Sequence, residues 1–182
     1  MSDILVAPWS QSKYLTVSSL LFIGPSVYAY NLNQKIISIM TLATSVASIN
    51  FWRRADYSWR RDCDLVIARG YAILMTYYGT IFITTVRESI ICYPSLVLYF
   101  YFYYKSQEMF NKNNDKWLLY HIATHITITY EQYAVIYIIN ESNVAHTYDE
   151  LGIPITIGLM ILYFIGFYKI HTECDSLTLF SL

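Results

Sequence analysis

The stretch from Lys116 to Asn140 reads KWLLYHIATHITITYEQYAVIYIIN and decides the fold of this chain. It is long and apolar enough to form a helix that crosses a bilayer, yet it contains His121, His125, Glu131 and Gln132. Such side chains are costly in hydrocarbon, so a membrane helix that keeps them uses them or pairs them. The two histidines are four residues apart, which places both imidazoles on one helical face. This is the spacing of two ligands of one metal ion, or of two stations in a proton relay.

The composition of the whole chain agrees with a membrane protein. Of its 182 residues, 55% are hydrophobic and 14% are charged, which is too apolar for an ordinary soluble domain. The formal net charge of −1 provides no basic surface, so we expect no nucleic-acid partner. The three cysteines include no CxxC pair and are expected to be free thiols.

Six apolar segments predict six transmembrane helices. They cover residues 15–32, 36–52, 65–85, 90–104, 117–139 and 153–170. The first is interrupted by Gly24 and Pro25, and a kink is expected there because proline cannot donate a helical hydrogen bond. We therefore predict an all-α membrane bundle of about six helices. The membrane domain covers residues 15–170, between an N-terminal arm, 1–14, and a C-terminal tail, 171–182.

The distribution of lysine and arginine predicts the orientation of the spans. Nine of the twelve fall on the side of the N-terminus and two on the other side, with Arg69 inside the third span. Because Lys and Arg concentrate in cytoplasmic loops, both termini are expected in the cytoplasm. The loop of residues 53–63 also carries Tyr57 and Trp59, and we expect it to lie at the level of the lipid head groups. Its predicted contacts with them are Arg53, Arg54, Arg60 and Arg61.

Polar residues of three different spans fall at one depth, near the cytoplasmic side. The second span ends there with Ser45 and Ser48, the third begins there at Asp64, and the fifth begins there with His121 and His125. At about 1.5 Å per helical residue, the two histidines lie roughly 6 and 12 Å deep. Hydroxyl, carboxylate and imidazole groups at one depth are the strongest functional signal in the sequence.

Each of these groups also has a purely structural interpretation. Small hydroxyl residues on the second span are typical of close helix–helix packing. Asp64 stands directly before an apolar run, where a helix N-cap is expected, and one residue can be both cap and ligand. A satisfied polar contact explains the histidine pair as well as a metal site does, since HxxxH is far less specific than HExxH. Glu131 is about 120° from the face of the histidines, so we expect it to take part in another interaction.

The order of hydroxyl, Asp and HxxxH resembles the CREST superfamily of membrane hydrolases, which includes the alkaline ceramidases and the adiponectin and progestin receptor relatives. In that family a Ser and a His four residues later lie on one helix, an Asp follows on the next, and a late HxxxH completes a zinc site. Here Ser48, or alternatively Ser45, matches the Ser. Asp64 matches the Asp, and His121 with His125 matches the HxxxH.

The chain departs from the family pattern in three ways. Trp52 stands four residues after Ser48, and Ile49 four residues after Ser45, so the third histidine has no counterpart. One span separates the Asp span from the HxxxH span, whereas the family has three. A sixth span follows the HxxxH, which lies on the last span in the family. The resemblance therefore covers four residues on three helices.

The resemblance implies a zinc-dependent hydrolase that acts on a lipid amide or ester. His121, His125 and Asp64 would hold Zn²⁺ with one position open for a water molecule, whose pKa the metal lowers to about 7. Ser48 or Ser45 would donate a hydrogen bond to the developing oxyanion, and Asp64 is either a ligand or the general base. We expect side-chain atoms of the three ligands to approach to about 4.5 Å of one another.

Two other classes of function stay open on the sequence alone. A non-enzymatic scaffold or assembly factor predicts histidines that are bonded to their neighbours and leave no open ligand position. A small ion or proton transporter predicts that Glu131 faces the interior in register with His121 and His125. Membrane lipids are the expected partners for each class, because all three are multi-pass integral membrane proteins.

The orientation can be tested with a reporter. A reporter fused after Leu182 should be reached only from the cytoplasmic side, because the bias of lysine and arginine places that end inside. Protease protection of sealed vesicles measures this. A reporter accessible only from outside the cell would reverse the predicted topology.

Overall fold

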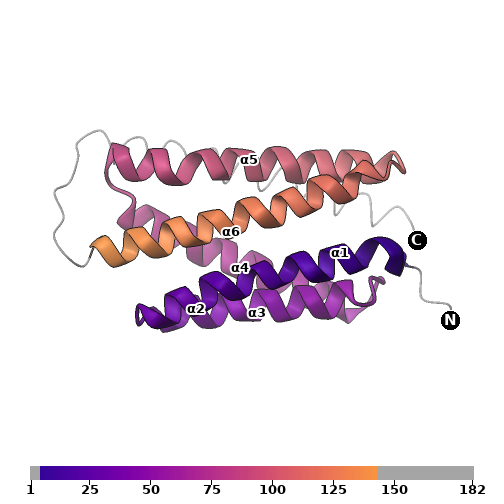
Figure 1. Ribbon diagram of the computed structural model, residues 1–182, viewed down its shortest axis with the longest axis horizontal. Coiled ribbons are helices and arrows are strands. Elements are labelled where there is room, and N and C mark those ends of the chain that lie inside the picture. Colours follow the sequence, from indigo (N-terminus) through magenta and orange to yellow (C-terminus); the bar gives the residue numbers. More distant parts are fainter. Residues whose placement is uncertain (1–4, 143–182) are drawn as a thin grey trace.

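The computed structural model describes residues 5–142, and all regular elements in that range are helices. The elements are α1 (Trp9–Ser19), the 3-10 turn η1 (Leu20–Phe22), α2 (Ile23–Asn31), α3 (Lys35–Trp52), α4 (Trp59–Phe82), α5 (Val86–Asn111) and α6 (Lys116–Ser142). Because α1, η1 and α2 follow one another without a break, the described part of the chain consists of five long helical rods (Figure 1).

The five rods correspond to the first five apolar segments of the sequence. The first rod begins at Trp9, six residues before the expected start, so the second part of the predicted N-terminal arm is helical. The fourth rod, α5, continues to Asn111, seven residues beyond the expected end. The predicted sixth span, 153–170, and the tail, 171–182, lie outside the described residues.

The first rod is irregular one turn before its proline. Pro25 has no N–H to donate to the carbonyl of Leu21, four residues earlier, and the backbone tightens into the 3-10 turn η1 at that place. The neighbouring glycine permits a close approach to α6. A Cβ atom on Gly24 would stand 2.2 Å from the hydroxyl oxygen of Tyr133, so the glycine leaves room for the Tyr133 side chain of α6 against α2.

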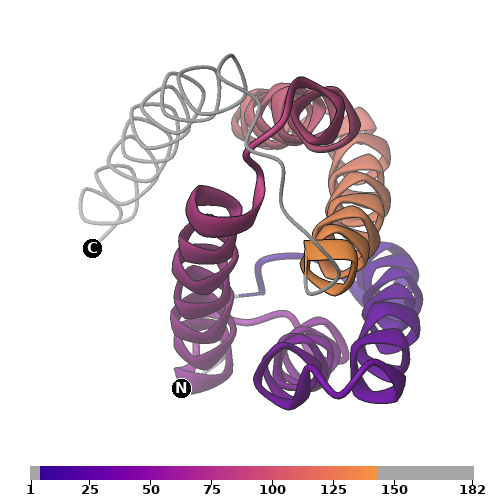
Figure 2. The same cartoon turned by 90° about the vertical axis from the view of Figure 1, so that its left-hand side faces the viewer.

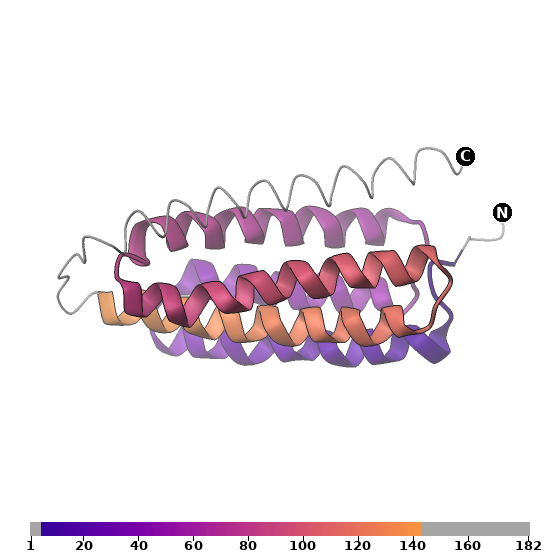
Figure 3. The same cartoon turned by 90° about the horizontal axis from the view of Figure 1, so that it is seen from above.

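The rods run alongside one another and surround α6 with neighbours. Figure 3 shows them side by side along their length, and Figure 2 shows them end-on. Helix α5 packs along α6, while α1 and α2 pack against α3. The first rod also contacts α6 on the side away from α5, and α4 contacts both α3 and α6. Helix α6, the stretch that opened the sequence analysis, is thus in contact with three other rods.

Small hydroxyl residues lie among the apolar residues of the interior, and many large apolar residues are exposed on the outside. Serine and threonine side chains are buried along the helix contacts, for example Ser19, Ser38, Thr41, Ser45, Ser95 and Thr124, beside buried apolar clusters. Large apolar side chains are exposed on the outer faces, for example Val17, Ile39, Val46, Ile73, Val97 and Leu119. The exposed faces of helices in a water-soluble bundle are mostly charged or polar. Small hydroxyl residues between helices and apolar residues outside are typical of bundles surrounded by lipid.

One described helix, α3, is by itself long and apolar enough to cross a membrane. The first rod is divided into elements that are each too short for a span, and α4, α5 and α6 carry charged residues, histidines and many tyrosines. A single helix of this kind is weak evidence of a membrane protein, because buried helices of soluble proteins also qualify.

Three segments far apart in the sequence meet at one end of the bundle. Leu5 and Asp56 form an antiparallel bridge, in which the backbone N–H of Val6 donates to the carbonyl of Ala55 at 2.8 Å. The side-chain amide of Gln11 donates to Asp115 Oδ1 at 2.8 Å. The N-terminal residues, the α3–α4 loop and the α5–α6 loop therefore lie at the same end (right in Figure 1), as expected for consecutive helical rods of alternating direction.

The buried carboxylate of Asp56 connects several residues of the α3–α4 loop and the start of α4. Its carboxylate is 1% exposed, accepts hydrogen bonds from the Ser58 hydroxyl and the Arg60 guanidinium, and stands 3.4 Å from Arg54 Nε. Two of the four arginines expected at lipid head groups are thus paired within the protein. Arg53 is exposed, and the guanidinium of Arg61 lies over the Tyr57 ring at 5.2 Å.

The start of α4 corrects one interpretation of the sequence. The helix begins at Trp59 after the N-cap residue Ser58, so Asp64 lies in the second turn and is not an N-cap. The polar run WRRDCD, residues 59–64, was expected to lie in the loop before the helix. In the structure these residues form the first turns of α4, because the helix already begins after Ser58. Asp64 is therefore free for a role other than capping.

The Asp56 contacts predict a pH-dependent stability. The hydrogen bond from Ser58, followed by Arg60 and Arg54, lowers the pKa of Asp56 below its ordinary value. A lowered folded-state pKa stabilises the protein fully above the ordinary aspartate pKa of about 4, and this stabilisation declines below that value until it is lost as the pH falls through the lowered pKa. Asp56→Asn should therefore cost about 1–3 kcal/mol at pH 7 and less at pH 3.

Thermal unfolding of the purified protein at both pH values measures this difference. Asp62→Asn, an exposed carboxylate on the same segment, serves as the matched control and should change stability little at either pH. An Asp56→Asn variant that unfolds like the native protein at pH 7 would show that the Asp56 contacts do not stabilise the loop.

Candidate functional site

A cavity of about 370 Å³ opens between α3, α4, α5 and α6. Aromatic rings form much of its wall, namely Phe22, Phe51, Trp52, Tyr57, Tyr71, Tyr99, Tyr103, Phe110 and Trp117. Polar side chains face it from all four helices, among them Thr44, Ser48, Asp64, Arg69, Ser106, His121, Thr124, His125, Glu131 and Gln132. An apolar cavity with a few convergent polar groups has the character of a ligand site.

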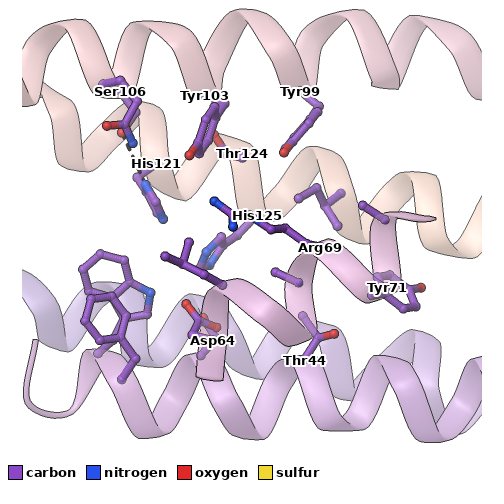
Figure 4. A pocket seen from close by; sticks show the side chains of 18 of the residues that line it. Thr44, Asp64, Arg69, Tyr71, Tyr99, Tyr103, Ser106, His121, Thr124 and His125 are labelled. Atoms are coloured by element: carbon purple, nitrogen blue, oxygen red, sulfur yellow. Dashed lines mark hydrogen bonds between the residues drawn. The ribbon is translucent and has the colours of Figure 1, made fainter. Parts of the chain in front are cut away.

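The structure brings most of the predicted site residues to this cavity. Ser48 of α3, Asp64 of α4, and His121 and His125 of α6 all line it, and Figure 4 shows Asp64 and the two imidazoles extending into the same space. Ser45 is the exception. Its hydroxyl donates to the backbone carbonyl of Ser19 at 2.8 Å, so it faces the first rod instead.

Each histidine is held through its Nδ1 atom by a serine of another helix. The Ser18 hydroxyl of α1 lies 2.8 Å from His125 Nδ1, and the Ser106 hydroxyl of α5 lies 3.3 Å from His121 Nδ1 (dashed in Figure 4). The two imidazole rings are 5.1 Å apart, centroid to centroid. Hydrogen bonds from two helices, α1 and α5, thus orient the two rings of α6.

These contacts favour one tautomer for both histidines. The Ser18 hydroxyl is placed to donate its one proton to the Leu15 carbonyl at 3.1 Å, and the Ser106 hydroxyl to the Trp117 carbonyl at 3.2 Å. We infer that each serine oxygen then accepts from an imidazole Nδ1–H. In a neutral imidazole with the proton on Nδ1, Nε2 carries a lone pair. His121 and His125 therefore offer two Nε2 atoms as bases or metal ligands.

Aromatic side chains surround the two imidazoles. The Trp52 ring lies 5.1 Å from the His121 ring in an edge-on arrangement, and Phe22 lies 5.2 Å from His125. Trp52 stands at the position where the CREST pattern has its third histidine, and its ring contacts that of His121. Because indole has only an N–H donor, Trp52 can shape the site but cannot bind a metal ion.

A metal site is not assembled as it stands. In the part of the chain that the structure describes, no three His, Cys, Asp or Glu side chains come close enough to hold one metal ion. Asp64 is half-buried on the facing helix and lines the same cavity as the two imidazoles. The arrangement offers two nitrogen ligands, and the Asp64 carboxylate lines the same cavity without completing a metal site.

Two polar residues lie farther along α6. Glu131 was expected to face away from the histidines, but it lines the same cavity because the opening extends around α6 towards α4. Gln132 is 1% exposed, and neither its Nε2 nor its Oε1 has a hydrogen-bond partner. Such an unpaired buried amide is costly and needs an explanation.

Helix α5 contributes side chains to the cavity wall, which was not predicted from the sequence. Tyr99, Tyr103 and Ser106 face the cavity from α5 (Figure 4), whereas the aromatic run there was read only as a membrane-interface feature. Their offsets of four and seven residues place them on one helical face, which was a usable signal. Ser18, the partner of His125, had no such signal, because its role depends on how the first rod packs against α6.

Comparisons with protein-family models, curated proteins and solved structures found no match to this chain. The cavity and its lining residues are therefore the basis for a functional proposal.

The tautomer assignment can be tested by nitrogen-15 NMR of histidine-labelled protein. The spectra should show Nδ1 protonated and Nε2 unprotonated for both histidines near neutral pH. Ser18→Ala should mix the tautomers of His125 and leave His121 unchanged, and Ser106→Ala should do the reverse. Protonated Nε2 atoms in the native protein would show that the serines donate to the histidines.

Proposed function

We propose that this chain is a multi-pass membrane protein that binds a lipid-like molecule in the cavity between α3, α4, α5 and α6. The observation that carries the proposal is the cavity itself, an aromatic-walled space of about 370 Å³ inside a bundle with apolar outer faces. A ligand with an apolar body and a polar end would match both kinds of lining.

The pattern of burial supports the membrane part of the proposal. Outward-facing residues such as Val46, Ile73 and Val97 are each more than half exposed and would lie in contact with lipid tails. The five rods are nearly parallel, and positive charges gather at the end formed by the α3–α4 and α5–α6 loops. This is the distribution that keeps such loops on the cytoplasmic side.

A second candidate function is hydrolysis of a lipid ester or amide with a bound zinc ion. Two unprotonated Nε2 atoms, oriented by Ser18 and Ser106, favour this candidate, since zinc ligands usually have such a second partner. A zinc ion would supply Lewis-acid polarisation of the substrate carbonyl and activation of water. In this reading His121 and His125 hold the ion, and Asp64 is a third ligand or the base.

The remaining groups have defined parts in such a reaction. Ser48 lines the cavity, and its hydroxyl lies 3.0 Å from that of Ser19, which also has the Leu15 carbonyl at 2.7 Å as an acceptor. In this reaction the Ser48 hydroxyl would turn its proton towards the oxyanion. The resemblance to CREST hydrolases is part of this second candidate. A scaffold needs no internal cavity, so the open space beside the histidines favours ligand binding over a scaffold.

Filling the cavity should expel the ligand. Ala72→Phe places a ring in the cavity from α4, and the lipid retained through purification and measured by mass spectrometry should fall several-fold. Ile73→Phe, the next residue on the exposed side of α4, is the matched control and should retain lipid. Equal lipid in both variants, with unchanged folding, would contradict a lipid site here.

Hydrolysis can be separated from binding. His125→Ala and Asp64→Asn should remove bound zinc and hydrolysis of a fluorogenic lipid ester while the variants still insert in membranes. Because removing groups that act on the reacting atoms typically lowers the rate by 100-fold or more, about 3 kcal/mol in the barrier, the effect is measurable. Purified native protein without zinc or hydrolysis would remove this second candidate and leave lipid binding intact.

A further inference from the structure

Gln132 is a buried amide without a partner beside an open cavity. It is 1% exposed, neither its Oε1 nor its Nε2 makes a hydrogen bond, and it lines the cavity next to Glu131. Buried amides without partners are rare, because the lost hydrogen bonds to water are not replaced. The unpaired atoms therefore mark a place where another molecule makes the missing bonds.

The position of Gln132 separates it from the histidines. It lies seven residues after His125, roughly 10 Å farther along α6 at 1.5 Å per residue. A smaller pocket of about 50 Å³ adjoins this part of the cavity and shares Glu131 with it. Its other described walls are mostly apolar, with Met75, Leu96 and Val135 among them, and include no lysine or arginine.

On the basis of the proposed lipid-binding function, we infer that Gln132 and Glu131 form a subsite for the hydroxyl-bearing head of a neutral lipid, such as a monoacylglycerol. A hydroxyl group donates one hydrogen bond and accepts others. It can therefore donate to Gln132 Oε1 or to the Glu131 carboxyl group and accept from Gln132 Nε2. A head with two adjacent hydroxyls satisfies the amide and the carboxyl group together.

Other head groups fit these two residues less well. An ester accepts hydrogen bonds only, so it leaves Gln132 Oε1 unpaired. An ammonium group donates only, so it leaves the Nε2 protons unpaired. A carboxylate accepts hydrogen bonds only, so it too leaves Gln132 Oε1 unpaired. Hydroxyls are the group that matches both halves of the amide.

The experiment compares two ligands of the same chain length. The full-length protein is placed in phosphatidylcholine nanodiscs, and its unfolding temperature is measured with 1-monodecanoylglycerol or with methyl decanoate, which has no hydroxyl. The monoacylglycerol should raise the unfolding temperature of the native protein, since a ligand that binds only the folded state stabilises it. Methyl decanoate should raise it much less.

The variant Gln132→Leu tests two effects of the unpaired amide, on the stability of the free protein and on ligand binding. The variant should unfold at a higher temperature than the native protein without ligand, because an unsatisfied polar group is replaced by an apolar one of similar size. It should also lose the shift caused by the monoacylglycerol. Thr127→Val is the matched control, since Thr127 is buried on α6, donates to the Ala123 carbonyl and does not line the cavity. This control should keep the ligand shift.

The outcomes distinguish this inference from the proposed function. If both ligands stabilise the protein equally, or if Gln132→Leu keeps the full monoacylglycerol shift, the hydroxyl subsite is wrong while the lipid cavity stands. If neither ligand changes the unfolding temperature and Ala72→Phe does not change the retained lipid, both are wrong. Should Gln132→Leu fail to fold, Gln132→Met in the same two-ligand comparison decides the question.

Discussion

The structure depends on the need to satisfy polar side chains on one central helix. Helix α6 carries two histidines, a glutamate and a glutamine inside the bundle, and many large apolar side chains are exposed on the outer faces of the bundle. The first rod supplies a hydroxyl to His125 and α5 supplies one to His121, so the packing of three rods is coupled to two side-chain hydrogen bonds. Removing either partner would leave a buried imidazole nitrogen unpaired, which costs more than a hydrogen bond between neutral groups contributes.

The same need explains why the interior is rich in small hydroxyl residues. Ser19 joins the first rod to α3 by donating to Ser48, and the Ser45 hydroxyl donates to the backbone of Ser19. Such residues let helices approach closely and make short hydrogen bonds across the contact. Where this packing stops, between α4 and the pair α5 and α6, the cavity opens. Gln132 is among the residues that line that opening, and its buried amide has no partner, so the unpaired polar group and the space for a ligand occur close together.

Much of the architecture follows from the apolar segments. Five of the six predicted spans correspond to described rods, because long apolar runs must form helices that satisfy their own backbone groups. The ends were less predictable. The helical start of α4 includes the charged run before Asp64, which the sequence analysis assigned to a loop, since capping at Ser58 and the Asp56 contacts decide where that helix begins.

By itself, the sequence determined that the chain forms long helices, that His121 and His125 share one helical face, and that Asp64 and Ser48 come near them in depth. These properties depend on local periodicity and on the alternation of spans, which the sequence contains directly. Only the tertiary structure decided that Ser45 turns to the first rod, that Glu131 reaches the cavity and that Ser18 holds His125. These properties depend on the rotation of each helix about its axis and on contacts between residues about a hundred positions apart, neither of which a local pattern encodes.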